Sequence, residues 1–432
     1  MLDRVRFAMR ALRHRDLRLF LLGQGISLIG SWMQQVAMSW LVYRMTGSTL
    51  VLGLIAFCSQ FPTFLVAGVA GALADRWSRY RMVFVAQIGL MLEAVVLAAL
   101  VLTGTVQVWH LIVLAAWSGL CSGFDVPARQ ALIVRFVNGQ DLPNAIALNS
   151  AIFNGARLVG PAIAGVMIAV VGEGPVFVLN ALSYLAVLGA MWAVEARDKG
   201  SSGGESVLRT MREGFRYAFG FPPIRAILVL LTLISLVGLP YSVLLPAFAS
   251  DVLHGGAGTL GLLTAAAGLG ALAGALTLAS RESVWGLGMF IVRCTALFGA
   301  ALVAFAWSRN VWLSSVLMMF AGFGIMATTA AMNTILQTLV EEQMRGRVMA
   351  LYTMAFIGLS PLGALFGGAL AERIGAPLTV GVGGLACVAL AVWFARELPE
   401  LREMVRPIYQ RMGIIPEVAS GIQSASDPRI KE

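Results

Sequence analysis

The sequence predicts an all-α membrane protein in which twelve transmembrane helices form two pseudo-symmetric six-helix bundles. Three observations predict this fold class: an apolar composition, twelve long apolar runs, and a repeat that relates the two halves of the chain. Of the 432 residues, 59% are hydrophobic and 12% are charged, whereas soluble domains contain about a quarter charged residues. The composition therefore excludes an ordinary soluble protein.

Twelve apolar runs have the length of about 20 residues that a helix needs to cross the hydrocarbon core of a bilayer. The first run follows a basic segment, but it is too long for a signal peptide and lacks an obvious cleavage site, so we interpret it as the first membrane helix. The runs are residues 19–42, 50–74, 82–103, 109–136, 144–170, 175–195, 224–249, 259–280, 286–307, 311–338, 347–371 and 377–396.

The basic residues predict the orientation of these helices, because Lys and Arg collect in cytoplasmic loops. With the N-terminus inside, most of the 31 Lys and Arg lie on the cytoplasmic side, and among loop residues only Arg44, Arg309 and Arg373 lie on the other. The sequence thus predicts a multi-pass protein of the cytoplasmic (inner) membrane with both termini in the cytoplasm. Lipid headgroups account for the net charge of +9, which needs no nucleic-acid partner.

One long polar interruption, residues 195–221, separates six spans from six spans. Its first part, Lys199–Gly204, has the composition of a flexible linker. Its second part, Val207–Tyr217, has apolar residues at helical spacing with arginines between them, which indicates an amphipathic helix on the inner leaflet or, alternatively, a partner-binding helix. The predicted domains are an N-terminal bundle (1–195), a cytoplasmic linker (196–223), a C-terminal bundle (224–396) and a cytoplasmic tail (397–432).

The two halves resemble each other at one constant spacing, and the matches extend through loops as well as spans. The recurring residues include Gly119, Gly160 and Gly165, which correspond to Gly322, Gly363 and Gly368. Internal repeats of this kind are expected where two bundles rock about a central site.

The turn between the second and third spans carries the most specific motif, made of Gly71, Asp75, Arg76 and Arg79. It resembles the signature loop of the major facilitator superfamily, G-x-x-x-D-R-x-G-R-R. The resemblance implies a gating motif, in which we expect Asp75 to face a helix N-terminus and nearby Arg129 or Arg135. Two residues depart from the pattern, since Ser78 replaces a glycine and Tyr80 replaces a basic residue.

Four further stretches resemble the branch of this superfamily that contains enterobactin exporters and macrolide efflux proteins. They are Pro127–Ala131, Asn144–Leu148, Gly160–Gly165 and Arg345–Leu351. The resemblance implies the major facilitator fold and export from the cytoplasm.

Polar residues at membrane depth are expected to face protein or water. Four of them form one stripe on the first span: Gln24, Ser27, Ser31 and Gln35. In the superfamily that the chain resembles, the first, fourth, seventh and tenth helices line the cavity. Amides, hydroxyls and aromatic rings with little charge suit a bulky amphipathic cargo. Hydrogen bonding between helices is the alternative role for each residue. The predicted cavity residues are Gln24, Ser27, Ser31, Gln35, Trp117, Asp125, Arg157, Tyr241 and Asn333.

Three charged residues lie well inside the spans of the first half. Arg157 is near the middle of the fifth span and is expected to pair with a carboxylate or with an anionic cargo. Asp125 and Glu93 are candidate proton carriers, because the membrane interior penalises the charge of a carboxylate. We rank Asp125 slightly ahead, since it lies on a cavity-lining helix; Glu93 is deeper but more peripheral, and a structural pairing is equally compatible with its position.

These observations predict a secondary transporter that exports bulky, siderophore-like or drug-like amphipathic molecules by alternating access, with protons as the coupling ion, and that acts as a monomer. A flippase for lysophospholipids or other lipids is the alternative. A membrane-embedded enzyme is disfavoured, since the sequence has no Ser/His/Asp grouping and no metal-ligand cluster. The absence of a nucleotide-binding loop argues against ATP as the source of energy. No cofactor is expected.

Overall fold

The structure is a computed structural model that describes residues 10–76, 78–194, 207–281 and 283–411, with the backbone alone for 67–76, 207–212 and 411. The first half contains η1 (Arg10–Arg13), α2 (Arg15–Thr46), α3 (Thr49–Arg76), α4 (Arg79–Leu102), α5 (Val108–Ile133), α6 (Leu142–Val171) and α7 (Glu173–Ala193). The second half contains α8 (Val207–Gly220), α9 (Pro222–Val237), α10 (Tyr241–Ala247), η2 (Phe248–Val252), α11 (Ala257–Ala279), α12 (Leu287–Trp307), α13 (Val311–Leu339), α14 (Glu342–Thr353), η3 (Met354–Gly358), α15 (Ser360–Ile374) and α16 (Ala376–Arg411).

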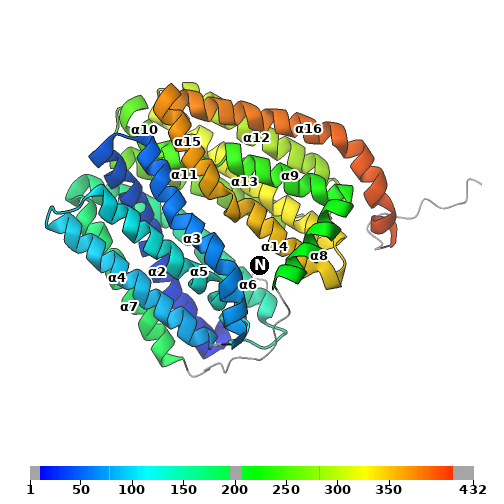
Figure 1. The fold of residues 1–432 in the computed structure, drawn as a ribbon, viewed down its shortest axis with the longest axis horizontal. Helices are drawn as coiled ribbons and strands as arrows, with labels where there is room; N and C mark the ends of the chain where they lie inside the picture. Colours follow the sequence, from blue (N-terminus) through cyan, green and yellow to red (C-terminus); the bar gives the residue numbers. More distant parts are fainter. Residues whose placement is uncertain (1–9, 77, 195–206, 282, 412–432) are drawn as a thin grey trace, which may run out of the picture.

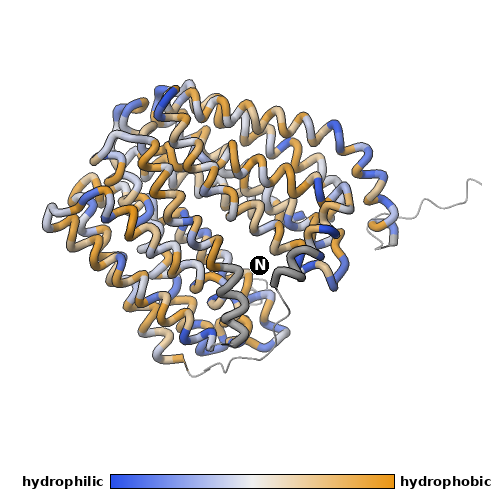
Figure 2. Tube along the Cα trace, viewed as in Figure 1, coloured by the Kyte–Doolittle hydropathy of each residue, from blue (hydrophilic) through white to orange (hydrophobic). Residues whose placement is uncertain are grey.

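Eleven helical segments of the described chain are long and apolar enough to cross a membrane. Helix α2 completes the twelve, because its 32 residues span about 48 Å at 1.5 Å per residue. Its glutamines and serines make α2 more polar than the other spans, as expected of a helix that packs against protein on several sides. Hydrophobic residues run along the helices and hydrophilic ones gather near their ends (Figure 2). The predicted fold class is confirmed.

The twelve spans form two bundles that lie side by side and diverge toward one end (Figure 1). Within the first bundle α2 packs on α6 and α7, and α5 packs on α3 and α4; within the second, α13 packs on α11 and α12, and α16 packs on α12. The bundles meet along two seams, α3 against α15 and α6 against α11. We call the end where α2 begins and α16 ends the terminal end, and the opposite end the far end.

Glycines at the two seams allow backbones of opposite halves to touch. A Cβ atom added to Gly165 of α6 would lie 2.8 Å from the Cα of Gly261 on α11, and one added to Gly368 of α15 would lie 3.0 Å from the Cα of Gly53 on α3. Gly165 and Gly368 are a pair of the sequence repeat. The repeat therefore marks equivalent contacts, where the absence of a side chain sets the distance between the halves.

The same correspondence holds inside the bundles. Gly119 of α5 lies against the backbone of Ser59 on α3, and its repeat partner Gly322 of α13 lies against the backbone of Ala267 on α11. Gly119 thus brings α5 against α3, and Gly322 brings α13 against α11 at the equivalent position. The two halves thus share their packing as well as their helix order.

Two spans that the sequence predicted as continuous helices are interrupted. The seventh span breaks between Val237 and Tyr241, where Pro240 lacks the N–H that a continuing helix would use. The eleventh span has a wider turn at 354–358 just before Pro361. The twelfth helix, by contrast, continues past residue 396 as far as Arg411, so the first part of the predicted tail is helical.

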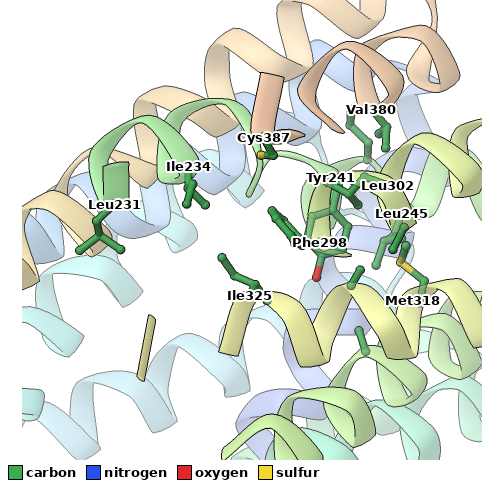
Figure 3. Packing of buried hydrophobic residues seen from close by; sticks show 14 of the residues in the cluster. Leu231, Ile234, Tyr241, Leu245, Phe298, Leu302, Met318, Ile325, Val380 and Cys387 are labelled. Carbon is green, nitrogen blue, oxygen red and sulfur yellow. The ribbon is translucent and has the colours of Figure 1, made fainter. Parts of the chain in front are cut away.

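A buried aromatic cluster fixes the second piece of the broken seventh span. Tyr241, at the start of α10, packs edge-on against Phe298 of α12 with 5.9 Å between ring centroids. Leu245 and Leu302 are buried beside this pair (Figure 3). The interruption therefore lies in a well-packed core, which holds α10 despite its short length.

The amphipathic segment predicted after the linker is helix α8, which packs against α14 of the second half. Arg347 of α14 donates to Glu213 of α8 with 2.6 Å between Nη1 and Oε2. Gly214 lies beside Arg347 and leaves room for its side chain. The link between the halves is thus tied to the second bundle at the terminal end.

The seam glycines generate a first prediction. In Gly261→Ala the added methyl group would lie 2.6 Å from the Cα of Gly165 and 2.7 Å from the carbonyl oxygen of Pro161. Overpacking of this kind costs about 1–3 kcal/mol. We expect a lower thermal unfolding midpoint in detergent for this variant, and no change for the control Gly189→Ala, where no atom lies within 4 Å of the added group. Equal midpoints would contradict a tight α6–α11 seam.

Candidate functional site

A carboxylate of one half caps a helix of the other half at the far end. Glu372 of α15 accepts hydrogen bonds through Oε2 from the backbone N–H of Thr49 at 2.9 Å and of Leu50 at 3.2 Å. The hydroxyls of Thr49 and Ser48 donate to the same oxygen at 3.0 and 3.1 Å. The first N–H groups of a helix have no partner within the helix and carry partial positive charge. Glu372 supplies both the missing acceptor and the opposite charge.

A second polar contact joins the halves at the far end, where the hydroxyl of Tyr43 on α2 donates to Asp251 of η2. Nearby, Arg44 forms an ion pair with Glu173 of its own half at 2.8 Å. Together with the glycine contacts, these interactions close the far end of the molecule.

The two halves part toward the terminal end. Helix α6 lies on α11 through Gly165, Pro161 and Leu158, which meet Gly261 and Gly268. The same face of α6 continues about two and three turns further through Ser150 and Ala147, and both of these residues are exposed. Because these two residues lie on the side of α6 that faces α11, their exposure indicates that α11 does not cover α6 at this level. The structure is therefore closed at the far end and open at the terminal end.

Arg157 lies where the two halves begin to separate. Its guanidinium carbon is 5.7 Å from the centre of the Trp32 ring on α2. Trp32 in turn makes an edge-on contact with Phe153 of α6, with 5.8 Å between centroids. Within the described chain Arg157 forms no ion pair with a carboxylate, so the expected internal partner is not found there. An arginine and two aromatic rings form the cluster instead.

The predicted polar stripe on α2 runs from the bundle interior to an exposed position. Gln24 is 1% exposed, its Oε1 has no hydrogen-bond partner in the described structure, and Ser27 is also buried. Ser31 hydrogen-bonds to the hydroxyl of Tyr184 on α7 at 3.3 Å, and Gln35 is exposed. Burial favours packing between helices for Gln24 and Ser27, and the hydrogen bond to Tyr184 indicates the same role for Ser31. Of the four residues, Gln35 is the exposed one.

Three other predicted cavity residues have different surroundings. Tyr241 is buried in the aromatic core of the second half. Asn333 of α13 is half-buried and accepts a hydrogen bond from Gln337 one turn on. Trp117 is 48% exposed and lines an apolar groove between α4 and α5, where its indole N–H donates to the carbonyl of Gly89 at 2.9 Å. The groove lies on the side of α5 away from α3 and from the seams.

Glu93 lies in a buried chain of hydrogen bonds that joins three helices. Glu93 of α4 is 3% exposed and accepts from the side-chain amide of Gln34 on α2 at 2.7 Å. The carbonyl oxygen of Gln34 accepts from Asn180 of α7 at 2.7 Å. Neither Gln34 nor Asn180 was predicted from the sequence. The available signal was the pair of adjacent glutamines, Gln34 and Gln35, near the middle of a membrane span. The carboxyl of Glu93 thus has an amide partner and no cation among the described residues.

Asp125 has a different environment, because a cation neutralises it. Its Oδ2 is 2.9 Å from Nη2 of Arg129, one turn along α5, and its Oδ1 accepts from Gln87 of α4 at 2.9 Å. The side chain is buried. Arg129 is therefore committed to Asp125 in this state.

The signature motif is only partly within the described structure. The side chains of Gly71, Asp75 and Arg76 lie outside the described residues, and Arg79 is the first residue of α4. Both departures from the motif have a structural role. The hydroxyl of Ser78 caps α4 by accepting from the N–H of Arg81, and the hydroxyl of Tyr80 donates to the carbonyl of Met191 on α7 at 2.8 Å.

This fold and this pair of seams define a polytopic transporter rather than an enzyme. The family model described as "Transmembrane secretion effector" matches residues 7–423. The chain therefore belongs to this family of the major facilitator superfamily, as its signature loop and repeat predicted.

Three relatives match over most of their length. The staphyloferrin A transporter of Staphylococcus aureus is 25% identical, with 87% of this chain and 94% of the relative covered. The multidrug efflux pump Tap of Mycolicibacterium fortuitum is 27% identical, with 87% and 93% covered. The enterobactin exporter EntS of Citrobacter koseri is 27% identical, with 91% and 94% covered.

Solved structures share the fold. An inward-facing, unoccupied bacterial homologue of the human lysosomal transporter Spinster aligns with a TM-score of 0.62 at 15% identity and covers 92% of this chain and 98% of its own. A POT family transporter in complex with 5-aminolevulinic acid aligns with a TM-score of 0.71 at 9% identity, with 90% and 96% covered. At these identities the likeness concerns the fold alone.

The far-end cap generates a second prediction. Glu372→Ala removes the acceptor of the α3 N-terminus, so we expect the far end to open more often; Glu372→Gln, which keeps one oxygen, should have a smaller effect. The measurement is the distance distribution between spin labels at exposed Met45 and Leu378, in a background without native cysteines. Glu403→Ala, at an exposed site on α16, is the control. An unchanged distribution in Glu372→Ala would exclude a latch at this position.

Proposed function

We propose that this protein exports amphipathic small molecules from the cytoplasm across the cytoplasmic (inner) membrane by alternating access, with both termini in the cytoplasm. The observation that carries the proposal is the state of the two seams, closed at the far end and open at the terminal end beside Arg157 and Trp32. With the termini inside, this is a state that can receive cargo from the cytoplasm. The efflux pump and the exporter among the relatives support the outward direction.

Release on the other side requires the far end to open and the terminal end to close. The seams allow this movement, because backbone contacts at glycines can roll or slide without having to disengage long side chains. In our proposal the Glu372 cap holds the far end in the inward-open state, and Asp75 of the signature loop acts at the terminal end in the outward-open state. Each end would then have a charged contact of its own.

Proton antiport is the proposed source of energy, and Glu93 is its best-placed carrier. A carboxyl group can take up and release a proton within the membrane when no cation fixes its charge, and Glu93 has only an amide partner among the described residues. Asp125, by contrast, forms an ion pair with Arg129. The two surroundings reverse the order expected from the sequence and favour Glu93.

Reconstituted vesicles with an imposed pH gradient test this third prediction. The fluorescent amphiphile dansylglycine serves as the transported probe. We expect gradient-driven transport in the wild type, at least a tenfold loss in Glu93→Gln, and normal transport in Glu400→Gln, at an exposed control site on α16. Asp125→Asn should retain coupling but lose stability, because it leaves Arg129 without its partner.

Two results would contradict the proposal. Transport that is insensitive to the pH gradient and to an uncoupler would exclude proton antiport, and coupled transport in Glu93→Gln would exclude Glu93 as the carrier. Movement of a fluorescent lysophospholipid in place of dansylglycine would favour the lipid flippase.

A further inference from the structure

Arg157 is a cation placed too deep in its helix to reach water past either end. It lies near the middle of α6, which runs from Leu142 to Val171. At 1.5 Å per residue the ends of this helix are about 20 Å away, several times the reach of an arginine side chain. A charge at this depth is costly unless protein, water or a ligand compensates it.

The acidic side chains of the neighbouring helices are already engaged elsewhere. Glu93 is bound by Gln34, and Asp125 is bound by Arg129. At the far end, Glu173, Asp251 and Glu372 contact Arg44, Tyr43 and the N-terminus of α3. Within the described chain, Arg157 therefore has an aromatic neighbour and no counter-ion.

The aromatic neighbour is held in place by close helix packing. A Cβ atom on Gly160 would lie 2.6 Å from the Cβ of Trp32, so the glycine lets α2 and α6 approach until Trp32 lies beside Arg157. The π face of an indole stabilises a guanidinium from one side and uses none of its N–H groups in hydrogen bonds. Those N–H groups are arranged to bind a planar anion through two oxygens.

An apolar surface adjoins this cation on the open side. Phe153, one turn toward the terminal end, is 43% exposed and leans on Trp32. Gly155 has no atom within 4 Å of the position that a Cβ would take. A molecule entering between the parted halves would meet an exposed aromatic ring and then a guanidinium that has no counter-ion among the described residues.

We propose that Arg157, Trp32 and Phe153 form an anion subsite, and that the cargo carries a carboxylate, sulfonate or similar planar-bonding anion attached to an aromatic or apolar body. The inference rests on the proposed export function, because the subsite is open to the side from which cargo would enter. Arg157 binds the anion, and the two rings contact the body of the cargo. Trp32 also holds the guanidinium in position when the subsite is empty.

The test uses three ligands that share one fluorophore and differ in charge: anionic dansylglycine, neutral dansylglycinamide and cationic dansylcadaverine. Binding to the full-length protein in nanodiscs is measured by energy transfer from tryptophan to the dansyl group. We expect the wild type to bind dansylglycine about tenfold or more tightly than the amide, as charge-assisted hydrogen bonds allow. In Arg157→Gln this preference should disappear, while the affinity for the amide is unchanged.

Two further variants keep the result interpretable. Arg157→Lys keeps the charge but loses the planar fork, so it should retain part of the preference. Arg293→Gln removes an exposed arginine within the α12 span, away from the subsite, and should bind all three ligands as the wild type does. If Arg157→Gln does not yield a monodisperse protein, Arg157→Lys decides the matter by its intermediate preference.

Three outcomes would overturn the subsite: equal binding of dansylglycine and its amide by the wild type, no measurable binding of dansylglycine, or a charge preference that persists in both Arg157 variants. Vesicle transport separates this failure from failure of the export function. Charge preference that depends on Arg157 without movement of any ligand would leave the subsite standing and refute export. Transport without dependence on Arg157 would do the reverse.

Discussion

The contact of backbone with backbone at the two seams is the constraint on which the rest of the structure depends. Gly53 meets Gly368 and Gly165 meets Gly261, so that the halves touch without intervening side chains. Such contacts gain dispersion energy from close approach. They also fix where each bundle can pivot, because a larger residue at any of these positions would separate the helices. The open terminal end and the position of Arg157 follow from this geometry.

The polar residues of the first bundle form two separate arrangements at membrane depth. One is neutral apart from its carboxyl group and joins Glu93, Gln34 and Asn180 across three helices. The other is an ion pair, Asp125 with Arg129, supported by Gln87. Buried hydrogen-bond chains of this kind fix the rotation of each helix about its axis. Helix α2 takes part through Gln34, which is next to Gln35 of the predicted stripe.

Much of the fold could be predicted from the sequence, because membrane helices are set by length and hydropathy and the halves by a repeat. The depth of Arg157 was equally predictable. The interruption at Pro240 was visible as a proline within an apolar run, but whether a proline bends or breaks a helix depends on the packing around it, here Tyr241 on Phe298. Trp117 shows the limit for the site, since sequence gives its helix but not the side of the helix that faces lipid. Glu372 gave no signal, because its partners lie more than 300 residues away along the chain.

The two seams are equivalent in helix order but differ in chemistry. Helix α3 has its N-terminus held by a carboxylate of the opposite half, whereas its counterpart α11 begins after Gly256, which provides no side-chain cap. The α3–α15 edge of the far end is therefore pinned at a helix terminus by a carboxylate with four donors. The α6–α11 edge rests on van der Waals contact between glycines, and beside it a single hydrogen bond from Tyr43 to Asp251 joins α2 to the segment before α11. A molecule restrained unequally at its two edges does not open as a symmetric hinge. Its bundles would separate first along α6 and α11 and rotate about the α3–α15 edge. The opening between the bundles would then be wider on the α6–α11 side of the molecule.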